Sequence, residues 1–149
     1  MTEVWFYHLE RLPLDRVLPN LLERTLERGW RAVVQVGSDE RLQALDTLLW
    51  TFSEESFLPH GSHKDGDVER QPVYLTSGAE NPNASNIRFL VDGADHQDLG
   101  DYERAIYIFD GHDDEAVAAA RDNWKAARDA GHEVTYWQQS EQGRWEKKA

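Results

Sequence analysis

The sequence predicts a three-layer α/β/α domain whose central sheet is mostly parallel and contains about five to six strands. Two observations lead to this prediction. Runs of β-forming residues alternate with amphipathic segments along the first half of the chain, and the connections between them are short. In addition, the run Arg31–Val36 (RAVVQV) is almost continuously apolar, as expected of a parallel strand that is buried on both faces.

Six segments are predicted to be strands because they are short, rich in apolar or aromatic residues, and bounded by turn residues. They are Glu3–Leu9, Arg31–Val36, Pro72–Thr76, Ile87–Val91, Ala105–Phe109 and Glu133–Gln138. The stretch from Phe52 to Gln71 and the acidic stretch from Asp92 to Tyr102 have the composition of loops.

Two helices are predicted in the first half of the chain from apolar residues that recur with the helical period. The first follows Pro13, has Asp15 as its cap and ends near Gly29, and Pro19 fits it only in the first turn or at a kink. The second follows Ser38, which is placed to cap it. Its apolar stripe consists of Leu42, Leu45, Leu48, Leu49 and Phe52.

A third helix, Glu115–Ala130, carries two different stripes. One stripe consists of small residues that can lie close to a sheet: Ala116, Ala119, Ala120, Asn123, Ala127 and Ala130. The other sets an indole among cations: Val117, Arg121, Trp124, Lys125 and Arg128. The strand that follows adds Val134, Tyr136 and Trp137.

This second stripe suits a ligand that has negative charge and an apolar end. A guanidinium group can hold a carboxylate through two parallel hydrogen bonds, and arginine and tryptophan are over-represented among binding hot spots. The alternative is that Trp124 belongs to the core and that the cations decorate the carboxyl-terminal part of a helix, where they are generally favourable. Spacing alone does not decide between the two interpretations.

Composition restricts the classes of function. The chain has 149 residues, of which 40% are hydrophobic and 11% aromatic, and this fits one globular domain spanning residues 1–149. A net charge of −12 argues against strong direct binding of nucleic acid. There is no cysteine for disulfides or thiolate chemistry and no apolar run long enough to span a membrane, and no secretory signal is expected. A cytoplasmic protein is expected.

A nucleotide site is not predicted. The turn after the first strand, where such a fold would bind phosphate, contains no glycine, and the chain has no GxxxxGK[ST] motif. Asp39 follows the second strand in the position of a ribose-binding carboxylate, but the accompanying glycines are missing. The fold is therefore expected to be Rossmann-like without a nucleotide site, and Asp39 is expected to be a capping or solvated residue.

The sequence gives only a weak indication of metal binding. His60, His63, Asp65 and Asp67 have the spacing of a hard-metal cluster, but they lie in a polar loop that shows no closed set of ligands. We expect no metal and no other cofactor. The alternative function is a degenerate nucleotide- or metal-dependent enzyme that uses Asp39 or the His60–Asp67 loop.

A second candidate surface is apolar. Aromatic and aliphatic residues crowd a short irregular segment, which suits a protein–protein interface or a loop anchored onto the core. They are Trp50, Phe57, Leu58, Pro59 and His60.

Three stretches resemble the chi subunit of bacterial DNA polymerase III holoenzyme: the FYHL start, the segment Leu45–Gly61, and the run Trp124–Ala149. The resemblance implies a non-catalytic α/β protein of the clamp-loader assembly, which links the replicase to single-stranded DNA-binding protein. It implies that the chain grips the acidic C-terminal tail of that protein, which ends in an apolar residue. In some bacteria the family also binds the small psi subunit.

The resemblance assigns particular residues. Arg121 and Trp124 correspond to a cation and an aromatic residue of the family's tail site. Val117 departs from the pattern, because the best-known members have a lysine at this position, and Lys125 or Arg128 would have to compensate. On the other surface, Trp50 and Phe57 match the aromatic residues that contact psi.

Overall fold

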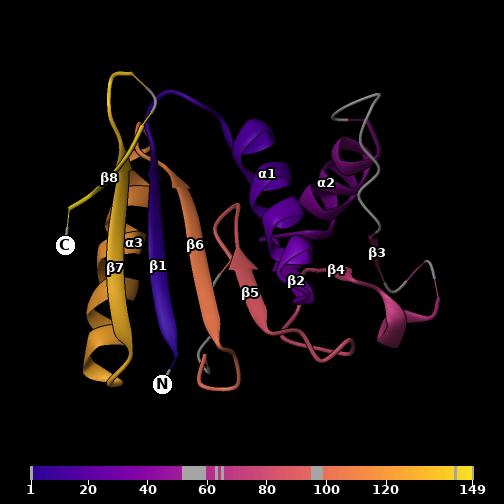
Figure 1. Ribbon diagram of the computed structural model, residues 1–149. Coiled ribbons are helices and arrows are strands. Elements are labelled where there is room, and N and C mark those ends of the chain that lie inside the picture. The colour runs from indigo at the N-terminus through magenta and orange to yellow at the C-terminus, as the bar shows by residue number, and fades with distance from the viewer. Residues whose placement is uncertain are drawn as a thin grey trace.

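The computed structural model describes residues 2–51, 60–62, 64, 66–94, 99–142 and 144–148. Eight strands are found in this part of the chain. They are β1 (Glu3–Leu9), β2 (Ala32–Gln35), β3 (Gly61–Ser62), β4 (Val73–Thr76), β5 (Ile87–Leu90), β6 (Arg104–Asp110), β7 (Glu133–Gln139) and β8 (Trp145–Lys147). All eight belong to one sheet, in the order β3-β4-β2-β5-β6-β1-β7-β8 (Figure 1).

Seven strands run parallel, and only β8 pairs antiparallel with its neighbour β7. The predicted α/β class with a mostly parallel sheet is therefore confirmed, and each of the six predicted strands is present with its ends within about one residue. The predicted number of strands is too low, because β3 and β8 were missed. These strands contain two and three residues, so they are too short to show an alternating pattern.

Three α-helices are described, namely α1 (Leu14–Glu27), α2 (Asp39–Thr51) and α3 (Asp114–Asp129), together with the short 3-10 helix η1 (Val68–Arg70). The first helix differs from prediction in two ways. Pro13, and not Asp15, is the residue that precedes it, and no side chain caps it. Pro19 lies buried in its second turn. At α2, the backbone N–H of Arg41 donates a hydrogen bond to Ser38 Oγ over 3.3 Å, as expected for the predicted N-cap residue.

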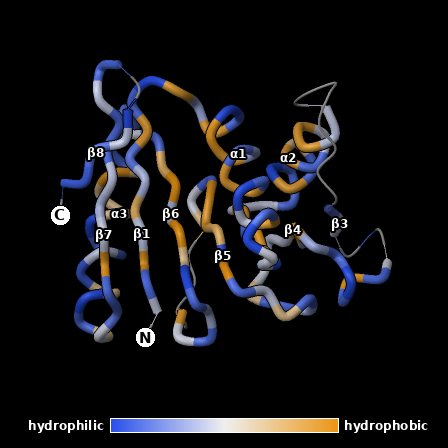
Figure 2. The backbone as a smooth tube through the Cα atoms, viewed as in Figure 1, coloured by the Kyte–Doolittle hydropathy of each residue, from blue (hydrophilic) through white to orange (hydrophobic). Residues whose placement is uncertain are grey.

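The helices lie on both faces of the sheet. Helices α1 and α2 cover one face, and α3 covers the other behind β6, β1 and β7 (Figure 1). Hydrophobic segments are concentrated in the central strands, whereas the edge strand β8 is mostly hydrophilic (Figure 2). The predicted three-layer architecture is thus present.

Helix α3 begins with a side-chain cap. One carboxylate oxygen of Asp113 accepts hydrogen bonds from the backbone N–H groups of Glu115 and Ala116, over 3.0 and 3.3 Å. Ala120 and Ala127 are buried against the sheet. The predicted stripe of small residues is therefore only partly a packing face, because other members remain half-buried or exposed. Ala116 and Asn123 are half-buried, and Ala119 and Ala130 are exposed.

Candidate functional site

The aromatic and cationic stripe of α3 meets strand β7 beside it. Trp124 is half-buried, and its ring centroid lies 5.6 Å from that of Phe6 and 5.9 Å from that of Tyr136. Val134 packs against the same cluster. We call this surface the α3 flank, and it consists of Val117, Arg121, Trp124, Lys125, Arg128, Val134 and Tyr136. Trp124 thus both contributes to the core and reaches the surface.

The cations of the α3 flank have no acidic partner among the described residues. Arg121, Lys125 and Arg128 are exposed, and none of them forms an ion pair with a residue in the described part of the chain. Arg121 is nevertheless close enough to influence Tyr136. Burial raises the pKa of the Tyr136 hydroxyl, and the positive charge of Arg121 opposes part of that rise.

A series of polar contacts fixes the side chain of Tyr136. Its hydroxyl lies 2.6 Å from His8 Nδ1, and His8 Nε2 lies 2.7 Å from Glu10 Oε1. The hydroxyl of Tyr136 and the imidazole of His8 therefore share a hydrogen bond. Gln138 Nε2 also donates to Glu10 Oε1, over 3.1 Å. Tyr136 is therefore held in a fixed orientation.

Trp137 does not belong to this surface. Successive side chains of a strand point to opposite faces, and Trp137 packs with Trp5 on the α1 face of the sheet, with ring centroids 6.1 Å apart. Tyr136 and Val134 point to the α3 face. The sequence-based grouping of Trp137 with Trp124 is thus wrong in its geometry.

A cleft lies at the carboxyl ends of β1, β5 and β6 and has a volume of about 800 Å³. It was not predicted. Helix α1 leads from β1 to β2 on one face, whereas α3 leads from β6 to β7 on the other. The chain therefore diverges between the neighbouring strands β1 and β6, which makes this the topological switch point where α/β sheets generally bind ligands.

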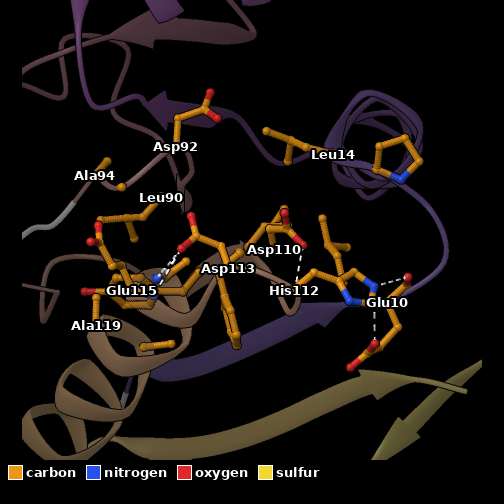
Figure 3. Close-up of a pocket in the computed structure, with 18 of the residues that line it drawn as sticks. Glu10, Leu14, Leu90, Asp92, Ala94, Asp110, His112, Asp113, Glu115 and Ala119 are labelled. Carbon is orange, nitrogen blue, oxygen red and sulfur yellow. Dashed lines mark hydrogen bonds and ion pairs between the residues drawn. The ribbon is translucent and has the colours of Figure 1, made fainter.

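Acidic and apolar side chains converge in this cleft from α1, the end of β5 and the start of α3 (Figure 3). Its apolar lining includes Leu12, Leu14, Leu90, Tyr107, Phe109 and Ala119. Its carboxylates are Glu10, Asp15, Asp92, Asp110, Asp113 and Glu115. We call it the acidic cleft.

The loop between β1 and α1 forms one margin of the acidic cleft, and the Gln139 side chain holds it through three hydrogen bonds. Gln139, which is 3% exposed, accepts hydrogen bonds through Oε1 from the backbone N–H groups of Glu10, Arg11 and Leu12, over 3.0, 2.9 and 3.1 Å. Such contacts between β7 and the loop after β1 join residues more than 120 positions apart, so no local sequence pattern indicates them.

The structure describes only part of the second predicted surface. Trp50 is 53% exposed, and its ring centroid lies 4.5 Å from that of His60. His60 is 5% exposed, and its Nε2 lies 3.1 Å from Asp46 Oδ1. The other members, residues 57–59, lie outside the described residues.

The structure also describes several of the residues on which the alternative, enzymatic hypothesis depends. Asp39 lies in the first turn of α2 and accepts a hydrogen bond from Ser77 Oγ over 2.6 Å. Of the proposed metal loop, His63 and Asp65 lie outside the described residues. Within the described ranges, no group of three or more histidine or acidic side chains is arranged to hold a metal ion. In the same ranges, no helix has both the length and the apolar character needed to cross a bilayer.

Comparison with known proteins decides the family. The sequence profile of the DNA polymerase III chi subunit matches residues 1–135. The chain belongs to the DNA polymerase III chi subunit family. This confirms the resemblance seen in the sequence, and the family is one of replication accessory subunits.

The chain is also similar to a probable DNA polymerase III subunit chi from Rickettsia prowazekii (strain Madrid E). The two sequences are 25% identical over 109 residues. The alignment covers 73% of this chain and 66% of the relative, slightly less than two thirds of its length. The matched profile of the chi family includes all of α3 and every residue that lines the acidic cleft.

Proposed function

We propose that this chain is a non-catalytic connector of the cytoplasmic replication machinery. In this proposal the α3 flank binds the acidic C-terminal tail of single-stranded DNA-binding protein and links that protein to the clamp-loader complex. The observation that supports it most is a half-buried indole beside three exposed cations, Arg121, Lys125 and Arg128, that lack acidic partners among the described residues.

The chemistry of the α3 flank suits such a tail. Arg121 would hold a carboxylate through two parallel hydrogen bonds, and Lys125 and Arg128 would attract the acidic residues before it. The apolar end would rest on Trp124 and Tyr136, whose rings lie 5.9 Å apart at 73°. Because the cations are exposed, we expect salt to weaken the interaction.

The test uses fluorescence anisotropy with a labelled acidic peptide that ends in Pro-Phe, titrated with the full chain at low salt. Arg121→Ala combined with Trp124→Ala is expected to abolish binding. Arg121→Glu alone should weaken it by about tenfold or more, because it replaces an attraction by a repulsion without removing the indole. Undiminished affinity in the double variant would show that the site assignment is wrong.

Two controls make this test specific. Arg16→Glu changes an exposed arginine on α1 to the same extent and should leave the affinity unchanged apart from a small effect of net charge. Circular dichroism must show that the Trp124→Ala variant remains folded, because Trp124 also packs on Phe6.

A second contact is proposed for the surface around Trp50. An indole that is 53% exposed is an unusual feature of a protein surface, and such side chains are enriched at interfaces. Together with residues 57–59, Trp50 would contact a clamp-loader subunit of the psi type, and the buried His60 would support its ring. Trp50→Ala should then reduce co-purification of clamp-loader subunits and leave binding of the acidic peptide intact.

The enzymatic alternative predicts a different result. A nucleotide or a divalent metal ion that binds through Asp39 or the His60–Asp67 loop would raise the melting temperature of the chain. A thermal-shift series with nucleotides and divalent metals therefore distinguishes it from the connector, for which no such stabilisation is expected.

A further inference from the structure

We propose that the acidic cleft binds a short basic segment of a partner protein, in which a lysine or arginine side chain stands beside an apolar residue. This goes beyond the binding of an acidic tail, and it concerns a different part of the molecule. The α3 flank uses Val117, Arg121 and Trp124, whereas the acidic cleft uses the neighbouring stripe with Ala116, Ala119 and Asn123.

The interior of the acidic cleft is apolar. Leu90, Tyr107 and Phe109 come from the sheet, and Leu14 and Ala119 come from the helices on either side. Leu12 is 42% exposed at the margin and is one of two large hydrophobic residues so exposed among those described. A volume of about 800 Å³ is within the range of natural ligand sites. An occupant with an apolar side chain would therefore bury exposed hydrophobic surface.

The charge of the lining determines which charge on a ligand is favoured. Six carboxylates and two guanidinium groups surround the acidic cleft. One of those guanidinium groups, that of Arg41, is already paired, because its Nε lies 3.2 Å from Asp92 Oδ2. The carboxylates of Asp15 and Glu115 are exposed and have no hydrogen-bond or ion-pair partner within the described part of the chain. A cation is therefore complementary to this lining.

Anions are disfavoured at the same place. The N-terminus of a helix usually attracts phosphate or carboxylate groups, but two of the free N–H groups of α3, those of Glu115 and Ala116, are used by the Asp113 side chain. Asp110, Asp114 and Glu115 add further negative charge around it. A nucleotide or an acidic tail would thus be repelled. The two sides of α3 therefore favour ligands of opposite charge.

The shape favours an extended chain over a compact molecule. A second depression, lined by Glu10, Arg11, Leu12, Glu141 and Gln142, shares its first three residues with the acidic cleft. Both depressions therefore border the loop held by Gln139. Glu141 adds a carboxylate beyond this loop. A peptide of several residues would span both depressions and place one side chain in the acidic cleft, which is the larger of the two.

The test uses two peptides and the full chain labelled with ¹⁵N. The probe is acetyl-Leu-Lys-Leu-Arg-Leu-amide, and the control replaces both basic residues with glutamine. Titration with the probe should shift the amide resonances of Asp92, Ala116 and Asn123, and salt should weaken the binding. The control peptide should bind at least about tenfold more weakly. Equal binding of the two peptides, or the absence of shifts at these amides, would overturn the proposal.

Variants locate the site. Asp15→Asn combined with Glu115→Gln should weaken binding of the probe by about fivefold, because the double variant removes two unpaired carboxylates at the rim of the acidic cleft. Ala119→Phe should fill the acidic cleft and weaken binding by about tenfold. Ala118→Phe is the matched control, since Ala118 is the exposed neighbour that does not line the cleft. Equal affinity of the two phenylalanine variants for the probe would overturn the proposed location.

The result is independent of the proposed tail site. Arg121→Ala with Trp124→Ala should leave the affinity for the basic probe unchanged, while it abolishes binding of the acidic peptide. Loss of the basic probe in this double variant would place its binding site on the α3 flank and overturn the proposal for the acidic cleft.

Discussion

The hydroxyl of Tyr136 and the Nδ1 atom of His8 lie 2.6 Å apart and connect neighbouring strands of the sheet. Tyr136 is a wall of the α3 flank. His8 in turn contacts Glu10, whose side chain lines the acidic cleft, over 2.7 Å. A series of polar contacts therefore runs from Tyr136 on the α3 flank to Glu10 in the acidic cleft, through a His8 side chain that is 12% exposed.

Tyr136→Phe is expected to lower the free energy of unfolding by about 1–2 kcal/mol, because it leaves a buried nitrogen of His8 without its partner. Urea denaturation followed by circular dichroism measures this loss. A double-mutant cycle with His8→Leu tests the cause, since the two losses should be less than additive if the hydroxyl and the imidazole stabilise one another. Simple additivity would contradict the coupling.

His112 is expected to titrate above the usual histidine pKa of about 6.5. The main cause is the hydrogen bond to the backbone carbonyl of Glu10, over 2.8 Å, and the Glu10 carboxylate and Asp110 raise the pKa further. NMR titration of the ring protons measures it. Glu10→Gln should lower the pKa of His112 but leave it above the usual value, because the carbonyl remains.

The raised pKa of His112 determines how the stability of the fold depends on pH. A pKa that is raised in the folded state means that the protonated form of His112 favours folding. Its contribution is fully present below the unfolded-state pKa and is lost as the pH rises through the folded-state pKa. A wild-type His112 that titrates at or below 6.5 would contradict the geometry around Glu10.

Arg88→Leu is expected to destabilise the fold by about 3 kcal/mol, although the sequence IRFLV around it indicates only a buried strand. Arg88 is 0% exposed. Its guanidinium donates to Gln35 Oε1 over 2.6 and 3.0 Å, to Gly78 O over 2.7 Å and to Tyr102 Oη over 3.0 Å. The substitution would leave these acceptors without donors. Urea denaturation should show the loss, and Arg16→Leu, on the exposed surface of α1, should show almost none.

These examples show which features the sequence could predict. The six longer strands and the three helices follow from local hydrophobic periodicity, and so does the stripe of Arg121 and Trp124 on α3. Trp137 is the exception within the predicted site, because alternation along β7 places it on the face opposite to Tyr136.

The remaining features depend on contacts between distant segments. Gln139 reaches Glu10 across 129 positions, and the acidic cleft combines residues that follow three different strands. Arg88 finds its acceptors on β2 and in the loops after β4 and β5. Neither composition nor spacing indicates such pairings, because they are determined by the order of the strands in the sheet. The switch point itself becomes visible only when that order is known.

Val117→Lys is expected to strengthen binding of the acidic peptide if the α3 flank is its site. Val117 lies one helical turn before Arg121, so a lysine there would place another ammonium group on the same stripe, as in the best-known members of the family. The expected gain is about three- to tenfold at low salt, and it should shrink as salt is added. Fluorescence anisotropy measures both effects. Ala118→Lys is the matched control, because it adds the same charge at the next residue but on the solvent-facing side of α3. An equal gain in the two variants would mean that net charge, and not a site on the α3 flank, controls the affinity for the acidic peptide.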